Sequence, residues 1–404
     1  MAIRFAAPDY RQMKRLMSRI PTDPGTPARS RRYVCFVMRA DYPEKAGGDA
    51  VQIEAYAREL EVRGWGVNLK PYRATMEFAA GEIVNLANVD RTYEFLDAYR
   101  QASAASARVF ASPIHHDLID TRRMRLKMDG SRAHRLLNTF LPEGAREAVV
   151  YLHRCVLPLR PARRVAAVVR LVQMATLRKT LVRAALDASE CVFLLAPGEG
   201  EALRRDYGWS GVKSALTPNG IESSISNLPW ADRPQGAIVC VGRIEPRKRQ
   251  LELLRSADAA GVAITFIGGM GTEQAYAEAF KDAITASASD WTGPVSHDRV
   301  QDELQRARVL VNASWLEVQS LVDLEAAANG CYVVSSPAGY SDEWLGDAVL
   351  KVSDWSTDSL VHLARQAARR ECGPEALSYV HTWSDTVGTL TLAYTQCTKV
   401  GGQE

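Results

Sequence analysis

The sequence predicts an α/β protein made of two doubly wound domains that face a cleft. Apolar, strand-like runs alternate with helix-like segments along most of the 404 residues, and this alternation is typical of parallel sheets with crossover helices. A polar stretch at residues 214–235 separates two such blocks. The composition, 47% hydrophobic and 24% charged, is that of an ordinary globular chain long enough for two domains.

The first block follows a basic lead-in and linker at residues 1–32 and is expected to form a domain at 33–210. Its predicted strands cover the apolar runs at 31–40, 65–72, 82–89 and 107–116, and an amphipathic helix is predicted at 51–64. Residues 121–183 interrupt the alternation with basic, helix-prone segments. We therefore expect a helical insert in this domain.

The second block is expected to form a domain at 211–380. Its predicted strands lie at 237–244, 262–269, 308–314 and 331–336, and its predicted helices lie at 252–261, 297–307 and 320–330. Residues 381–404 are expected to form a helix and tail that cross back to the first domain.

The two halves of the chain carry opposite charge. Residues 1–183 hold 32 Lys/Arg and 18 Asp/Glu, a net +14, whereas residues 184–404 hold 18 and 29, a net −11. Most of the basic excess lies in 121–183, where 15 basic residues accompany 3 acidic ones. The first half is therefore predicted to face something anionic.

The sequence indicates a cytoplasmic protein. No run of 18 apolar residues lacks a charge, and the first residues lack the apolar core of a secretory signal. The seven cysteines are scattered and form no CxxC pair, so we expect reduced, mostly buried thiols. They are Cys35, Cys155, Cys191, Cys240, Cys331, Cys372 and Cys397.

Two cations follow a predicted strand of the second domain. Arg243 and Lys248 lie in "VGRIEPRKRQ", just after the strand that ends at Gly242. A planar guanidinium and an ammonium at this edge can neutralise a diphosphate. The alternative is a solvated basic turn.

Two glutamates, Glu317 and Glu325, stand eight positions apart in "SWLEVQSLVDLEAAANGC". Eight residues rise about 12 Å along a helix, whereas hydrolytic carboxylate pairs need roughly 5–9.5 Å between groups. Two contacts on one long ligand therefore fit better than an acid/base pair, and a carboxylate suits sugar hydroxyls. The alternative is a pair of acids favoured by the helix dipole.

The first domain has two weaker candidates. Gly47 and Gly48 precede a predicted helix, where a backbone can approach a phosphate closely, although a simple turn would also explain them. His115 and His116 end a buried strand. No nucleophile motif or second metal-ligand cluster accompanies them, so we expect no metal site, and a capping or core histidine is the alternative reading.

Taken together, these features resemble the family 4 glycosyltransferases, which have the GT-B fold. The resemblance covers roughly residues 33–118 and 185–397. It rests on Glu317 and Glu325 in an E-x7-E arrangement, and on "GRIEPRK", which resembles G-R-L-x-x-x-K. It also rests on "TPNGIE", which resembles P-N-G-[VI]-[DE], on "FIGGMG" at a predicted strand end, and on the closing "YVHTWSDTVGTLTLAY". The family's E-G-F-G is replaced here by Glu317-Val318-Gln319-Ser320.

The resemblance implies metal-independent, retaining hexosyl transfer from a GDP- or UDP-linked sugar, with no other cofactor. Arg243 and Lys248 would hold the donor diphosphate, Glu325 the ribose and Glu317 the transferred sugar. Ser320 and Leu321 would also line the donor site, the Gly47-Gly48 backbone would approach the distal phosphate, and His115 or His116 would lie beside the sugar. The acceptor, a glycan or a lipid-linked molecule in cell-surface polysaccharide or glycolipid synthesis, would dock on the first domain.

Three other functions remain as alternatives. A nucleotide-sugar 2-epimerase shares the architecture but would need further acidic residues in the cleft. A non-catalytic subunit that binds a membrane partner would not need Arg243, Lys248, Glu317 and Glu325 together. Nucleic-acid binding lacks a recognition motif.

The insert at 121–183 suggests a membrane-surface element. "RRVAAVVRLVQMATLRKTLVR" alternates apolar residues with Arg and Lys, a pattern typical of a helix in an anionic interface. This predicts a peripheral protein on the inner face of the membrane. The alternative is a helix packed on the core with solvated arginines.

Overall fold

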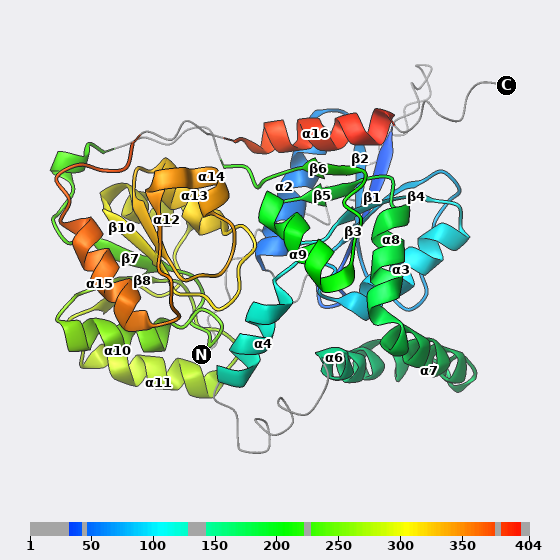
Figure 1. Cartoon of the computed structure of the whole chain (residues 1–404), viewed down its shortest axis with the longest axis horizontal. Coiled ribbons are helices and arrows are strands. Elements are labelled where there is room, and N and C mark those ends of the chain that lie inside the picture. The colour runs from blue at the N-terminus through cyan, green and yellow to red at the C-terminus, as the bar shows by residue number, and fades with distance from the viewer. Residues whose placement is uncertain (1–31, 43–46, 128–142, 222–227, 376–380, 397–404) are drawn as a thin grey trace.

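The computed structural model describes residues 32–42, 47–127, 143–221, 228–375 and 381–396. They form two domains side by side, each built on a six-stranded sheet whose paired strands are all parallel. In Figure 1 the N-terminal domain lies on the right and the C-terminal domain on the left. The predicted fold class, two doubly wound domains, is confirmed.

The N-terminal sheet has the strand order β2-β1-β3-β4-β5-β6. Its inner strands are buried on both faces, as expected for a parallel sheet covered by helices. The strands are β1 (Tyr33–Met38), β2 (Gly66–Pro71), β3 (Ile83–Ala87), β4 (Arg108–Ser112), β5 (Val192–Leu194) and β6 (Ser214–Leu216).

Alternate residues of β1 supply the two cores of this domain. Phe36 packs with α2 (Gly48–Val62) and α16 (Trp383–Gln396), whereas Val37 packs with helices on the other face. The helices on that other face are α3 (Thr92–Ala104), α6 (Glu143–Tyr151), α7 (Pro161–Thr176), α8 (Arg178–Ala188) and α9 (Pro197–Tyr207), with a π-helical turn η1 (Leu152–Val156).

The C-terminal sheet has the order β12-β11-β10-β7-β8-β9. Its strands are β7 (Ile238–Val241), β8 (Thr265–Ile267), β9 (Asp290–Trp291), β10 (Val309–Asn312), β11 (Tyr332–Ser335) and β12 (Val349–Lys351). One face carries α10 (Gln250–Ala260), α11 (Gln274–Thr285) and α15 (Thr357–Ala368). The other carries α12 (His297–Arg306), α13 (Leu321–Ala328) and α14 (Asp342–Leu345). The short 3-10 turns are η2 (Trp230–Asp232) and η3 (Gly346–Ala348).

The N-terminal sheet extends past the boundary expected at residue 210. Strand β6 pairs with β5 from Ser214 to Leu216, so the change of domain comes after it. The chain returns at α16, which lies along the N-terminal domain in Figure 1 and packs against α2. There the Tyr394 hydroxyl accepts a hydrogen bond from the Asn85 amide (2.8 Å).

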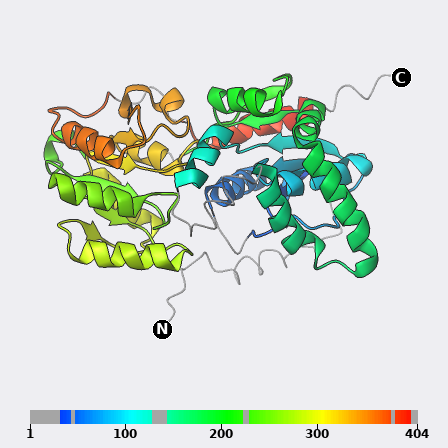
Figure 2. The ribbon, with the colours of Figure 1, turned by 60° about the horizontal axis from the view of Figure 1, so that its bottom comes forward.

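The described part of the basic insert is helical. Helix α4 (Leu118–Lys127) runs between the two domains, and α6 and α7 lie at the margin of the N-terminal domain (Figures 1 and 2). Residues 128–142 lie outside the described residues. Among the described helices, none is long and apolar enough to cross a bilayer. All of the described cysteines are free thiols, and Cys372 is the exposed one among them.

The two domains meet where strands of both sheets end. Ile114, which follows β4, forms an apolar cluster with Leu195, Val318 and Tyr340. The Trp344 indole donates to the Leu195 carbonyl (2.9 Å). Ligands of open α/β sheets bind beyond the carboxyl ends of the strands, so this junction is where a functional site is expected.

Candidate active site

The loop after β7 carries the predicted cations. It starts at Gly242, whose φ of 145° is rare for residues with a side chain. A Cβ at the facing Gly268 would lie 2.2 Å from the Gly242 carbonyl oxygen. The close approach of the two chain segments after β7 and β8 therefore requires a glycine at residue 268. Arg243 is 42% exposed and makes a long contact with Glu245 (3.7 Å). Its guanidinium is therefore accessible at the carboxyl edge of the sheet.

Lys248 and Glu317 form an ion pair between two loops. The Lys248 ammonium donates to the Glu317 carboxylate at 2.5 Å, and both side chains are mostly buried. Burial alone would raise the pKa of Glu317, but the charges of Lys248 and Arg247 outweigh it and lower this pKa to about 2. Glu317 is therefore an ionised carboxylate at neutral pH.

Helix α13 follows Glu317 directly. Ser320 caps it by accepting a hydrogen bond from the Asp323 amide, and Leu321 is its first residue. Glu325 lies in its second turn, so the two predicted glutamates come from a loop and a helix, respectively. The structure thus gathers Lys248, Glu317 and the start of α13 at the end of β7 and β10.

Asp323 is a buried carboxyl that the sequence analysis missed. It accepts hydrogen bonds from the Asn312 amide and the Ser341 hydroxyl, each at 2.9 Å. Burial and the neighbouring Glu317 charge raise the pKa of Asp323 to about 6. Its contacts tie the start of α13 to β10. In sequence it appears as one more acid in the first helical turn, where the helix dipole also favours it.

The loop after Glu317 is linked to the interdomain connection through Gln319. The Gln319 side-chain oxygen accepts from the Asn219 backbone amide (2.6 Å), and the Asn219 side chain donates to the Gln319 carbonyl (3.1 Å). Gln319 thus fastens the loop after Glu317 to the "TPNGIE" segment.

A stack of two arginines and two tryptophans spans the domains beside this loop. Trp315 and Trp355 lie parallel with ring centroids 5.0 Å apart. The Arg249 guanidinium lies 4.2 Å from the Trp315 centroid, and that of Arg123, on α4, lies 4.8 Å from the Trp355 centroid. Because Trp315 is two residues before Glu317, the stack connects the insert of the N-terminal domain to the site loop.

Gly47 and Gly48 lie at the start of α2. Gly47 caps the helix with extended backbone, and its carbonyl accepts from the Ala50 and Val51 amides. A Cβ at Gly48 would meet nothing within 4 Å, so packing does not account for this glycine. Residues 43–46 of the preceding loop lie outside the described residues.

The two histidines have different surroundings. The His115 ring is fully buried, with Nδ1 at 2.7 Å from Asp90 and Nε2 at 2.9 Å from Asp206. The His116 ring is 24% exposed, and its Nδ1 donates to the other oxygen of Asp90 at 2.7 Å. His115 is therefore a core residue with no ring nitrogen left for a ligand, whereas His116 reaches the surface.

His115 is bound at three points. Besides its two ring contacts, its backbone amide donates to Glu199 at 2.8 Å. Burial would lower the pKa of His115, but Asp90 and Asp206 raise it to about 9. Because Ile114 packs against Val318, this histidine loop lies next to the loop that carries Glu317.

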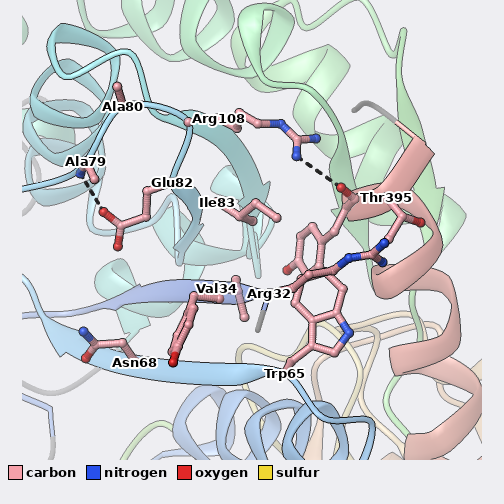
Figure 3. A pocket seen from close by; sticks show the side chains of 13 residues that line it. Arg32, Val34, Trp65, Asn68, Ala79, Ala80, Glu82, Ile83, Arg108 and Thr395 are labelled. Carbon is pink, nitrogen blue, oxygen red and sulfur yellow. Dashed lines mark hydrogen bonds between the residues drawn. The ribbon is translucent and has the colours of Figure 1, made fainter. Parts of the chain in front are cut away.

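No group of three or more His, Cys, Asp or Glu in the described ranges could hold a metal ion. A cavity of about 650 Å³ lies at the opposite, amino-terminal edge of the N-terminal sheet (Figure 3). Arg32, Trp65 and Arg108 are among its lining residues, and it contains none of the candidate site residues.

Comparisons with known proteins agree with this fold. Residues 235–368 match the family model "Glycosyl transferases group 1". Sucrose-phosphate synthase from Thermosynechococcus elongatus is 15% identical with a TM-score of 0.60, and the match covers 91% of this chain and 99% of that one. A search of curated proteins with the sequence found no match.

Two other solved structures have the same architecture. HepE of Anabaena in complex with UDP is 12% identical with a TM-score of 0.55, covering 91% of this chain and 98% of that one. The catalytic domain of starch synthase IV from Arabidopsis thaliana, bound to ADP and acarbose, is 11% identical with a TM-score of 0.54, covering 90% and 99%. The chain has the GT-B fold, and the family match in its C-terminal domain supports a glycosyltransferase.

Proposed function

We propose that the protein is a retaining glycosyltransferase that moves a sugar from a nucleotide-sugar donor to a glycan or lipid-linked acceptor. The observation that carries this proposal is the pairing of the Arg243–Lys248 loop with Glu317 and the start of α13. The region that matches the glycosyltransferase family model contains all of these residues.

The donor diphosphate would lie against Arg243 and Lys248. Arg243 has an exposed guanidinium with one long ionic contact, so a phosphate can bind it without breaking a strong pair. The backbone amides at the start of α13, which is capped by Ser320 and begins at Leu321, would favour an anion there. Glu325, one turn further, would accept hydrogen bonds from the ribose hydroxyls.

The transferred sugar would lie between Glu317 and the N-terminal domain. Glu317 is held in its ionised form by Lys248, so it can accept hydrogen bonds from sugar hydroxyls. On the opposite side, His116 is the better candidate than His115, because both ring nitrogens of His115 are already bound. The open space over Gly48 would admit the distal phosphate.

Retaining transfer on one face of the sugar fits these charges. Positive charge grows on the anomeric carbon as the bond to the diphosphate breaks, and negative charge grows on the leaving oxygen. Arg243 and Lys248 stabilise the leaving group, so cationic side chains would take the place that a metal ion has in other transferases. Two solved relatives in fold carry UDP and ADP. UDP, GDP and ADP sugars are therefore the donors to test.

The acceptor would reach the site from an anionic membrane surface. Helix α7 is apolar on two opposite sides: Ala167, Leu171 and Met174 are buried in the core, whereas four valines face outward. These valines, spaced on one helical face, are Val165 (71% exposed), Val168 (40%), Val169 (51%) and Val172 (59%). A continuous exposed apolar face indicates an interaction surface.

The charge of this region favours an anionic partner for the valine face. Residues 152–183 contain eight Lys/Arg and no Asp/Glu. A second copy of the same surface would bring like charges together, whereas an anionic lipid surface attracts the arginines and accepts the valines. We infer peripheral binding through α7, which would place a lipid-linked acceptor near the N-terminal domain.

A donor screen tests the proposed reaction. Purified protein is incubated with UDP-, GDP- and ADP-linked hexoses, and release of the nucleoside diphosphate is measured, with the anomeric configuration of the product determined by NMR. We expect slow hydrolysis of one donor class with retention of configuration. If none of the donors is turned over, the proposed transferase activity is contradicted. If the sugar is changed but remains linked to its nucleotide, the protein is an epimerase.

A further inference from the structure

One carboxylate, Asp90, binds two adjacent histidines. Asp90 lies in the loop between β3 and α3, and its Oδ1 contacts the His115 Nδ1 at 2.7 Å. Its Oδ2 accepts from the His116 Nδ1 at 2.7 Å and from the His116 backbone amide at 3.1 Å. Both oxygens are therefore occupied by neighbouring residues of a loop at the domain junction.

The other side of His115 is fixed as firmly. Its Nε2 donates to Asp206, on α9, and the same Asp206 oxygen accepts from the Leu118 amide at the start of α4. A ring whose two nitrogens both contact carboxylates carries a hydrogen on each, so His115 is an imidazolium shared by Asp90 and Asp206. Arg205 balances the second carboxylate at 3.1 Å. The buried imidazolium of His115 fixes the orientation of Asp90.

The fixed Asp90 determines the chemistry of His116. With the Nδ1 hydrogen donated to Asp90, the Nε2 of neutral His116 carries a lone pair and can only accept. In the described part of the chain, the hydrogen bonds of His116 all go to Asp90, so Nε2 is left for a ligand at the partly exposed edge of the ring.

We propose that Asp90 is a positioning residue, which uses the buried His115 as its anchor and holds His116 in the tautomer whose Nε2 accepts a hydrogen bond from a donor-sugar hydroxyl. The role of Asp90 in sugar transfer rests on the proposed function, whereas its effect on the tautomer of His116 does not. A carboxylate is required, because an amide oxygen can accept from only one of the two rings while its NH₂ group faces the other.

The variant Asp90→Asn tests this role. The NH₂ group then faces the Nδ1 of one histidine, and we expect His116 to lose its preference for the tautomer with hydrogen on Nδ1. In ¹⁵N NMR spectra of the histidine side chains, neutral wild-type His116 should show a protonated Nδ1 and an unprotonated Nε2, with its signals assigned by their loss in His116→Ala. A wild-type pattern of His116 in Asp90→Asn would overturn the proposal.

Kinetics give the second readout. We expect Asp90→Asn to lower kcat by about tenfold, the value of roughly one hydrogen bond, with unchanged affinity for the bare nucleoside diphosphate. Adding Asp90→Asn to His116→Ala should change kcat no further, because Asp90 acts through His116. A further large loss in the double variant would contradict that. The control, Asp117→Asn, removes a neighbouring acid that pairs with Arg205 and should behave as wild type.

The two experiments distinguish an error in the proposed function from an error in the role of Asp90. If wild-type protein turns over no nucleotide sugar, the proposed function is wrong, and the NMR spectra alone decide whether Asp90 fixes the tautomer of His116. If transfer occurs but the tautomer is unaffected by Asp90→Asn, the proposed function stands and the role of Asp90 is wrong.

Discussion

The Lys248 ammonium lies 2.5 Å from the Glu317 carboxylate and joins the loop after β7 to the loop after β10. Arg243, on the same loop as Lys248, is more exposed and has a weaker partner. Two cations that would share one task in catalysis therefore differ in what they do for the folded protein.

Alanine substitutions separate these two roles. We expect Arg243→Ala and Lys248→Ala each to lower transfer by about 100-fold or more, because each removes a preorganised cation at the leaving group. Only Lys248→Ala should also lower the free energy of unfolding, by about 1–3 kcal/mol, since it leaves a buried carboxylate without its nearest partner. Urea unfolding and a transfer assay measure the two effects. The control Arg255→Ala, on α10, should change neither; equal stability of the two site variants would contradict this account.

The two glutamates should differ in binding. If Glu325 holds the ribose, Glu325→Ala should weaken binding of the bare nucleoside diphosphate about tenfold, the value of one or two hydrogen bonds. Glu317→Ala should spare that binding and lower turnover, because its partner would be the sugar. Calorimetry with the nucleotide measures this, with Glu278→Ala on the exposed face of α11 as control. Similar affinities in the two site variants would show that the assignment is wrong.

The buried His115 predicts a dependence of stability on pH. Its folded-state pKa of about 9 exceeds the ordinary value of 6.5 because Asp90 and Asp206 face it, with the neutralising Arg205 behind Asp206 and the Glu199 carboxyl at its amide. A raised folded pKa means that the stabilisation is complete below about pH 6.5 and is lost as pH rises towards 9.

Urea unfolding between pH 6 and pH 9.5 measures this loss. The contribution amounts to about 1.4 kcal/mol for each pK unit of difference between the folded and unfolded states. In Asp206→Asn the folded-state pKa should fall, so its stability should decline less over this range. Asp117→Asn should follow the wild type. A wild-type curve that is flat from pH 6.5 to 9 would contradict an imidazolium at this position.

The valine face of α7 predicts lipid binding. We expect the protein to sediment with vesicles that contain anionic lipid and to stay in the supernatant with neutral vesicles. Salt at 0.5 M should weaken the binding to anionic vesicles. The double variant Val165→Ser/Val169→Ser should reduce binding without changing stability, because both side chains are exposed. Ala167 and Leu171 are buried in the core, so substituting them would lower stability. The control is therefore Thr176→Ser at the end of the helix. Equal sedimentation with neutral and anionic vesicles would exclude this surface.

The strands that consist of continuous apolar runs were predictable from the sequence, because a strand covered by helices on both faces must be apolar throughout. Tyr33–Met38 and Val309–Asn312 are examples. The strands β6, β9 and β12 have two or three residues each and carry no such run. Missing β6 placed the domain boundary at 210, before the sheet had ended.

The candidate site was predictable where its residues lie close in sequence. Arg243 and Lys248 share one loop, and Glu317 and Glu325 one loop–helix unit. The surroundings of His115 were not predictable, because Asp90 and Asp206 are 25 and 91 residues away and have no spacing signal. The same applies to Asp323, whose partners Asn312 and Ser341 come from two other segments. Such contacts depend on tertiary packing alone.

Titration calorimetry of UDP, GDP and ADP with the wild type and with Arg243→Ala is the decisive experiment for the proposed nucleotide-sugar site. We expect at least one of the three nucleotides to bind the wild type and to bind Arg243→Ala about 10- to 100-fold more weakly, the value of a charge-assisted hydrogen bond. Binding of none of them, or equal binding to both proteins, would contradict it.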